Sequence, residues 1–125
     1  MKIIEFQSLS NSDIDAILSA LPLIFCSGFE VSEMQQDMNL AFAENVTKKL
    51  INHQDINDPN EWRVLCIAVL LAHHHLTGKR RLDLDAETQA EISKHFFAYN
   101  KLAPSCDKML ETLEEHLGLV SDLHT

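Results

Sequence analysis

Three consecutive histidines, at positions 73–75, are the residues of this chain whose type points most directly to chemistry. Imidazole is a frequent ligand of zinc and other transition metals, so a metal site is one interpretation. Two helical ligands share a face only when they lie three or four residues apart, and consecutive residues point roughly 100° apart. The run can therefore supply one or two ligands. A metal- or small-ligand-binding domain would need others, such as His53, His95 or a nearby carboxylate.

We favour a structural interpretation of His73, His74 and His75. One of them is then a buried core histidine, and the other two lie near the carbonyl end of a helix, where a partial positive charge suits the helix dipole. The sequence contains no HExxH, no GxSxG, no glycine-rich phosphate loop and no CxxC pair. We therefore predict no metal, no cofactor and no enzymatic activity.

The segment from His75 to Arg81, HLTGKRR, is similar to the His…Gly-Asn-Lys/Arg-Arg core of Fic/Doc-type nucleotidyl transferases. In that family the core also follows an apolar helix, and the resemblance implies binding of a nucleotide phosphate. Lys79 stands where the family has Asn, and Thr77 where it has an acidic residue. Residues 82–85 restart with helix caps instead of continuing as the phosphate-binding helix.

The cysteine pattern and the N-terminal sequence predict a cytoplasmic protein. Cys26, Cys66 and Cys106 are odd in number and far apart, which is typical of free thiols and not of a disulfide framework. The segment MKIIEFQSLS has no apolar stretch of the length found in signal peptides.

The chain has 125 residues and a formal net charge of −9. This charge disfavours binding to nucleic acids and to anionic membranes, because both present negative phosphates. The basic cluster at residues 79–81 is flanked by acids, so we interpret it as a solvated loop and not as a phosphate site. A basic protein partner is compatible with the charge.

An acidic stripe is expected on a helix predicted between residues 32 and 52. At roughly 100° per residue, Glu33, Asp37 and Glu44 fall within roughly 40° of one another. Apolar residues lie alongside them, namely Leu40 and Ile51. A separate broad apolar side of the same helix carries Met34, Met38, Ala41, Phe42 and Val46.

The first 45 residues hold seven acids against a single base. An acidic surface speeds the encounter with a basic protein and adds affinity. We therefore predict a partner-binding surface on the 32–52 helix, extended by the acids that precede it. Its residues are Glu33, Asp37, Leu40, Glu44, Asp13, Asp15 and Glu30. A second acidic group on the last helix is an equal contender, made of Asp107, Glu111, Glu114 and Glu115.

These features favour a small bacterial protein-binding module, an inhibitor of the immunity or antitoxin kind that neutralises a toxin. Toxic nucleases are basic because they bind phosphates, so an acidic inhibitor surface complements their active sites. The resemblance to immunity proteins lies in size, charge and helicity only. Two alternatives stay open: the metal- or ligand-binding domain described above, and a helical subunit that homodimerises through exposed apolar residues.

The stretch that must position these residues runs from Asp58 to Gly78. Asp58 is a helix cap, Glu61 is placed to complete a capping box, and Gly78 favours the left-handed conformation that closes a helix. Residues 64–72 are apolar on every side, yet the run is too short to span a bilayer. We therefore predict a central core helix over residues 59–77.

Caps and prolines mark the elements before this helix. Residues 10–13 are typical of a helix start, and Pro22 should end or kink that helix. Residues 23–25 then form a buried turn or a short second helix. Residues 1–9 are either an extended arm or a helical turn.

After the central helix, Asp83 or Asp85 caps a fourth helix that ends at Asn100. Residues 101–104 are predicted to form a turn around Pro104, and Ser105 caps a last helix. The predicted fold class is all-α. We expect one domain over residues 1–125, with about five helices in a compact bundle around the central one.

Overall fold

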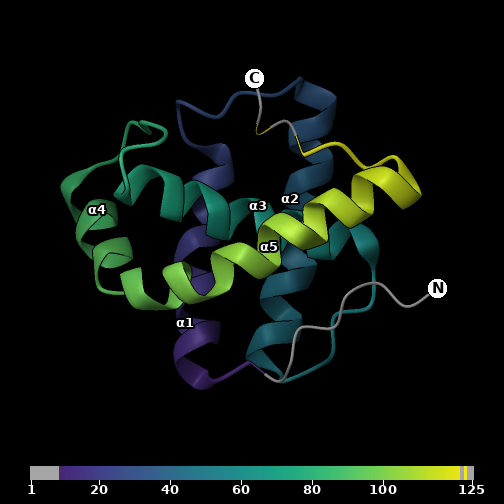
Figure 1. Cartoon of the computed structure of the whole chain (residues 1–125), viewed down its shortest axis with the longest axis horizontal. Coiled ribbons are helices and arrows are strands. Elements are labelled where there is room, and N and C mark those ends of the chain that lie inside the picture. Colours follow the sequence, from purple (N-terminus) through teal and green to yellow (C-terminus); the bar gives the residue numbers. More distant parts are fainter. Residues whose placement is uncertain (1–8, 122, 124–125) are drawn as a thin grey trace.

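The computed structural model describes residues 9–121 and 123, and these residues form helices joined by short loops without any β-strand (Figure 1). The predicted all-α class is confirmed. The prediction for residues 1–9 falls almost entirely outside the described part. The elements are α1 (Asn11–Ala20), a 3-10 helix η1 (Leu21–Phe25), α2 (Glu33–Ile51), α3 (Pro59–Leu76), α4 (Ala86–Ser93) and α5 (Phe96–Leu117).

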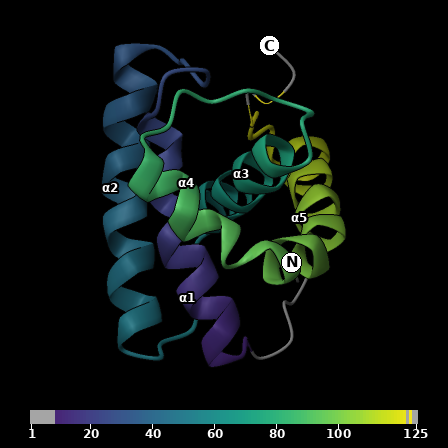
Figure 2. The ribbon, with the colours of Figure 1, turned by 90° about the vertical axis from the view of Figure 1, so that its left-hand side faces the viewer.

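Helix α3 is the centre of the bundle, as the sequence predicts. Figure 2 shows α2 on one side of it and α5 on the other. Every residue from Val64 to Ala72 is at most 1% exposed. The Oδ1 of Asp58 accepts from the backbone N–H groups of Asn60 and Glu61, which caps the helix start. Gly78 follows the helix end with a φ of +79°.

The start of α1 is stabilised by a capping box. The hydroxyl of Ser10 accepts from the backbone N–H of Asp13, and the Asp13 carboxylate accepts from the backbone N–H of Ser10. Pro22 ends the α-helical geometry, and the chain continues as η1, which confirms the predicted short second helix. The hydroxyl of Tyr99 donates to the carbonyl of Ala16 over 2.7 Å and joins α1 to α5.

The prediction for residues 86–117 is wrong in one respect. Asp85 caps α4, but α4 ends at Ser93, and α5 runs without a break from Phe96 to Leu117 through Pro104. Proline removes only one N–H, and the carbonyl that loses its partner belongs to Asn100, which is exposed and open to water. Packing of the buried residues before and after Pro104 against α3 outweighs that loss. Those residues include Tyr99, Leu102, Ala103, Cys106 and Met109.

Candidate functional site

The inner side of α2 is held against α3 partly by buried polar groups. Asn39 and Arg63 are each 2% exposed, and the Nη2 of Arg63 donates to the Oδ1 of Asn39 over 2.8 Å. Lys49 pairs with Glu61, which is 4% exposed. Glu61 therefore serves the α2–α3 contact, and the capping box predicted with Asp58 is not formed. Because buried polar groups need specific partners, these pairs define how α2 is rotated about its axis.

This rotation differs from the one that the apolar residues of α2 suggest. The buried residues of the helix are Asn39, Ala43, Val46 and Leu50. Of the broad apolar side expected from the sequence, Val46 is fully buried and Phe42 packs partly against the core, but Met34 is 73% exposed and Met38 is 44% exposed. Pairing of Asn39 with Arg63 places the amide inside and turns both methionines toward solvent.

The outer face of α2 combines carboxylates with exposed apolar side chains. It consists of Glu33, Met34, Asp37, Met38, Leu40, Ala41, Glu44, Lys48 and Ile51, all of which are exposed. Leu40 is 48% exposed and Ile51 is 60% exposed. Residues 33–44 hold three acids and no base. Glu33, Asp37, Leu40 and Glu44, the residues predicted for the partner surface, are thus all accessible on α2, and their role in binding stays a prediction.

Among the acids expected to extend this face, the structure buries one and separates the other two. Asp13 is 5% exposed and pairs with Lys101 besides capping α1, so it does not extend the surface. Glu30 is exposed immediately before α2, whereas Asp15 is exposed in the first half of α1. Because α1 begins beside the end of α2 (Figure 2), Asp15 and Glu30 lie toward opposite ends of α2.

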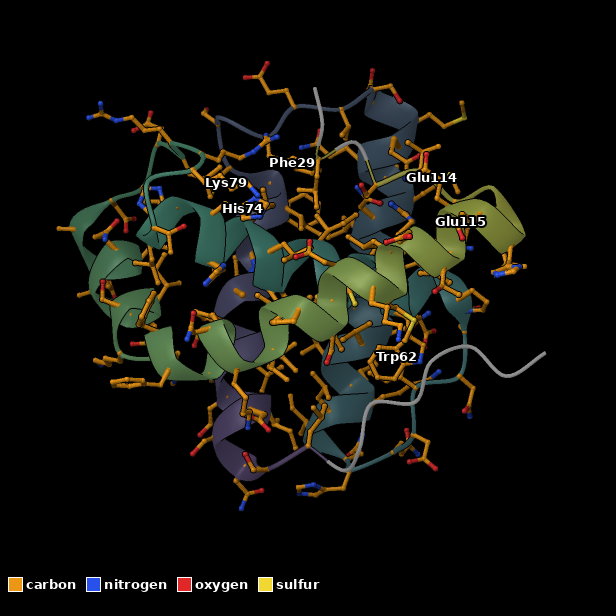
Figure 3. The ribbon with its side chains drawn as sticks, in the orientation of Figure 1. Phe29, Trp62, His74, Lys79, Glu114 and Glu115 are labelled. Atoms are coloured by element: carbon orange, nitrogen blue, oxygen red, sulfur yellow. The ribbon has the colours of Figure 1, made fainter. Side chains whose placement is uncertain are left out.

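The second acidic group lies across α3 from the outer face of α2 (Figure 2). Its four residues, Asp107, Glu111, Glu114 and Glu115, are exposed on α5. The first three line a pocket of about 350 Å³, and His74, Lys79 and Arg80 line it from the end of α3 and the loop that follows. We call it the α3–α5 pocket. Figure 3 shows His74 and Lys79 beside the end of α3, and Glu114 and Glu115 toward the end of α5.

Arg80 is fixed at the edge of this pocket by backbone carbonyls. Its Nη1 donates to the carbonyl of Gly28 over 2.9 Å, and its Nη2 donates to that of Leu123 over 2.6 Å. The guanidinium carbon also lies 5.7 Å from the ring centre of Phe29. Gly28 has a φ of +103°, and a Cβ there would lie 2.6 Å from the carbonyl oxygen of Arg81, so the contact requires glycine.

The three histidines face different neighbours, in agreement with their 100° separation. The Nδ1 of His75 accepts from the backbone N–H of Leu82, so its Nε2 carries the proton and donates to the Oε1 of Gln89 over 2.6 Å. The Nε2 of His73 lies 3.2 Å from the Oδ1 of Asn100. Two members of the run therefore serve to connect α3 with α4 and α5.

His74 is the member that faces the α3–α5 pocket. Burial lowers its pKa, and the positive charge of Lys79 lowers it further, so the ring is neutral at pH 7. Within residues 9–121 and 123, no three histidines, cysteines or carboxylates are grouped closely enough to hold a metal ion. Nothing in the described geometry supports the metal-binding alternative.

Two of the cysteine thiols, those of Cys26 and Cys66, lack the environment of a nucleophile. All three are free. Burial, followed by the neighbouring Cys106, raises the pKa of the Cys66 thiol. Burial, followed by the charges of Asp85 and Asp83, raises the pKa of Cys26. A catalytic cysteine needs a lowered pKa, so neither environment activates its thiol.

In the described part of the chain, no helix has both the length and the apolar character required to cross a membrane. Comparison with known proteins yields no match: no family model, no curated protein and no solved structure matches this chain. We therefore infer its function from the geometry and charge of its own residues.

Proposed function

We propose that this protein binds a basic protein partner through the outer face of α2, and that it acts as an inhibitor of the immunity kind. The observation that carries the proposal is the composition of that face. Three carboxylates, of Glu33, Asp37 and Glu44, alternate there with large apolar side chains that the fold does not bury.

The two kinds of side chain have complementary roles in such a complex. Carboxylates raise the encounter rate with a positively charged protein and disfavour wrong partners. The apolar side chains of Met34, Met38 and Leu40 supply surface that is removed from water on binding, which is the main source of affinity. Methionine adapts its shape to a partner better than branched residues do.

The rigidity of α2 also suits this role. The Asn39–Arg63 and Lys49–Glu61 pairs hold the helix in one rotation, so the outer face does not have to be ordered when the partner binds. Binding is tighter when less conformational entropy is lost on association. A toxin domain that recognises phosphates has the positive charge that this face complements.

The test takes as candidate partners the basic proteins encoded by genes adjacent to the gene of this chain, and each is examined in turn. Its affinity is measured by titration calorimetry at about 50 and 300 mM salt, a range over which screening weakens exposed charge pairs. Inhibition of its toxic activity is measured in parallel. The triple variant Glu33→Lys, Asp37→Lys, Glu44→Lys should weaken binding on the order of 100-fold at low salt, mainly through a slower association rate.

The matched control is the triple variant Glu111→Lys, Glu114→Lys, Glu115→Lys, which changes the net charge by the same amount on the other side of α3. It should retain most of the affinity. Equal weakening by both triples would show a general charge effect and would reject the α2 face.

The homodimer alternative is tested in the same samples by analytical ultracentrifugation. Self-association through α2 would bring like charges close together and would be favoured by added salt. A dimer that the α2 triple variant dissociates or tightens, with no binding of the basic neighbour, would replace the inhibitor proposal.

A further inference from the structure

The exposed side of α5 carries a basic stripe, although the chain as a whole is acidic. Its lysines recur at every seventh residue, which is close to two helical turns and places them on one face. An exposed phenylalanine and a proline lie between them. We call this set the lysine stripe. It consists of Lys94, Phe97, Lys101, Pro104 and Lys108, all of which are exposed.

Phe97 is the most exposed large apolar side chain in the described part of the chain. It is 85% exposed, and its ring lies 6.2 Å from that of Phe96, which is half-buried. Aromatic side chains of this kind are the usual anchors of protein interfaces, because they remove a large apolar area from water when a partner covers them.

The lysines of the stripe keep donors available for a partner. The Nζ of Lys94 lies 3.2 Å from Glu91, and that of Lys101 lies 2.7 Å from Asp13. An ammonium group has three N–H donors, and these two side chains are 68% and 61% exposed. Each can therefore contact a second carboxylate without losing the first.

The outer face of α2, together with Glu30 just before it, carries the matching pattern of opposite charge. Its acids also recur at every seventh residue, with apolar side chains between them. When the two stripes are read in opposite directions, they match position by position. Glu44 then faces Lys94, Asp37 faces Lys101 and Glu30 faces Lys108, while Ala41 faces Phe97 and Met34 faces Pro104.

One molecule cannot bring its own two stripes together, because α2 and α5 lie on opposite sides of α3 (Figure 2). We propose that the lysine stripe of one molecule docks antiparallel on the outer face of α2 of a second copy of this chain. The contact is heterologous, so each copy keeps one stripe of each kind free, and further copies can add to the chain.

The match between the stripes favours a second copy over other acidic partners. A nucleic acid would meet the net charge of −9 and the carboxylates of Glu91 and Asp107 beside the lysines. Faces of about three helical turns bury less area than a permanent interface needs, so we expect a dissociation constant of about 100 µM.

Self-association and partner binding use the same face of α2. A basic partner that binds there would displace the second copy, and this competition rests on the proposed function. The self-association itself does not, because it requires only the two stripes.

Sedimentation equilibrium of the unmodified protein tests the contact. At about 150 mM salt the general repulsion between acidic copies is screened beyond about 8 Å. The average mass should rise above that of one chain as the concentration increases from about 10 µM to 1 mM. Association should weaken at about 500 mM salt, because the contact depends on exposed charge pairs.

A charge exchange identifies the two stripes. The double variants Lys94→Glu, Lys108→Glu and Glu30→Lys, Glu44→Lys should each weaken self-association by about tenfold or more, because like charges then face each other. An equimolar mixture of the two should associate again, since the intact lysine stripe of one meets the intact α2 face of the other. Lys101 is left unchanged because it pairs with the buried Asp13.

The matched control is the double variant Lys79→Glu, Arg81→Glu, which makes the same change in net charge at exposed positions outside the stripe. It should leave self-association within about twofold of the unmodified protein. Phe97→Ser should weaken it by about fivefold. Leu117→Ser, which removes an exposed apolar side chain elsewhere on α5, should not. Circular dichroism should show native helix content for every variant.

Several results would overturn the proposal. They are a constant mass of one chain up to about 1 mM, association that added salt strengthens, equal weakening by the control and the stripe variants, and a mixture of the two charge variants that stays monomeric. None of them bears on the inhibitor proposal, whose readout is the binding and inhibition of a different protein. Failure of that binding would likewise leave the self-association measurements unchanged.

Discussion

The outer face of α2 and the pocket side of α5 carry the same sign of charge but have different neighbours. On α2 the carboxylates alternate with exposed methionine, leucine and isoleucine side chains, and the first twelve residues of the helix contain no base. On α5 the carboxylates border a cavity whose other side carries Lys79 and Arg80. The number of acidic residues alone does not distinguish the environment on α2 from the environment on α5.

The comparison shows that the side chains around a carboxylate, and not its charge alone, determine what kind of molecule it can bind. A flat mixed face offers apolar area and steering, which suits another protein. A cavity bordered by charges of both signs does not present such a surface of a single sign. The two surfaces are also fixed differently. Buried polar pairs hold α2 in place, whereas backbone contacts at Gly28 and Arg80 hold the edge of the pocket.

The largest effect is expected where the edge of the pocket is fixed. Gly28→Ala should lower the free energy of unfolding by about 3 kcal/mol, because a methyl group would meet the carbonyl of Arg81 at a φ that disfavours alanine. Gly78→Ala is the matched control, since its φ is also positive but nothing lies within 4 Å of a Cβ there. It should cost about 1 kcal/mol. Urea unfolding measures both, and equal losses would contradict the close contact at Gly28.

The polar contact beneath α2 gives the next effect. Arg63→Met should destabilise the protein by about 2 to 3 kcal/mol, because it keeps much of the aliphatic stem but removes the donor to the buried Asn39. Arg81→Met, at an exposed arginine, should change stability by less than about 0.5 kcal/mol. A loss for Arg63→Met no larger than that of Arg81→Met would show that the Asn39–Arg63 contact does not help to hold α2 in place.

Asp13 provides a prediction that depends on pH. Burial alone would raise the pKa of Asp13, but hydrogen bonds with Lys101 and Ser10 outweigh it and hold the pKa below its usual value of 3.8. A carboxyl group whose pKa is lower in the folded state stabilises the fold above its unfolded pKa. That contribution is lost as the pH falls through the folded pKa.

Asp13→Asn should therefore lower the free energy of unfolding by about 1 kcal/mol at pH 7. The difference from the unmodified protein should shrink as the pH falls below the usual pKa of 3.8, and it should nearly disappear once the pH is well below the lowered pKa of Asp13 in the folded state. Thermal unfolding across pH 2–7 measures it. Asp15→Asn, at an exposed neighbour in the same helix, should show no such dependence. A difference at position 13 that is independent of pH would rule out a role for the ionised carboxylate.

The smallest effect is expected on the outer face of α2. Met34→Ser and Leu40→Ser should change the free energy of unfolding by less than about 0.5 kcal/mol, because the fold buries neither side chain well. Val46→Ala, on the inner side of the same helix and 0% exposed, should cost about 2 kcal/mol. Weakened partner binding with unchanged stability would show that the outer apolar residues serve binding. If all three substitutions lowered the free energy of unfolding equally, the outer and inner sides of α2 would not differ in their contribution to stability.

Helix boundaries set by caps were predictable from local residues. Asp58 and Gly78 bracket α3, whose observed end at Leu76 lies one residue before the predicted one. Ser32 caps α2 as expected, since its hydroxyl accepts from the backbone N–H of Gln35. Such contacts form between residues two to four apart, so the sequence nearby contains all the information they need.

Elements that depend on distant packing were predicted less well. A turn at Pro104 was the local expectation, but the residues around it are buried against α3, and α5 passes through without a break. The capping box predicted at Glu61 does not form for the same reason, because the Glu61 carboxylate pairs with Lys49, twelve residues earlier in the chain. A contact between separate helices outweighed a local preference in both cases.

The same distinction between local and long-range information applies to the two acidic surfaces, on α2 and on α5. The i, i+4, i+7 spacing of Asp107, Glu111 and Glu114 is visible in the sequence, as is the stripe on α2. That these carboxylates share a cavity with Lys79 and Arg80 is not visible in the sequence, because Lys79 and Arg80 follow the end of α3 and the carboxylates lie in α5, some thirty positions later.

The sequence by itself determined that this chain is helical, that residues 64–72 form its core and that its surface is acidic. These properties depend on side-chain type, on short-range capping and on the total number of charges. Only the tertiary structure decided which side of α2 faces solvent and which carboxylates of α5 border a pocket. Both depend on how whole helices rotate and cross, and that is set by buried contacts between residues far apart in the chain.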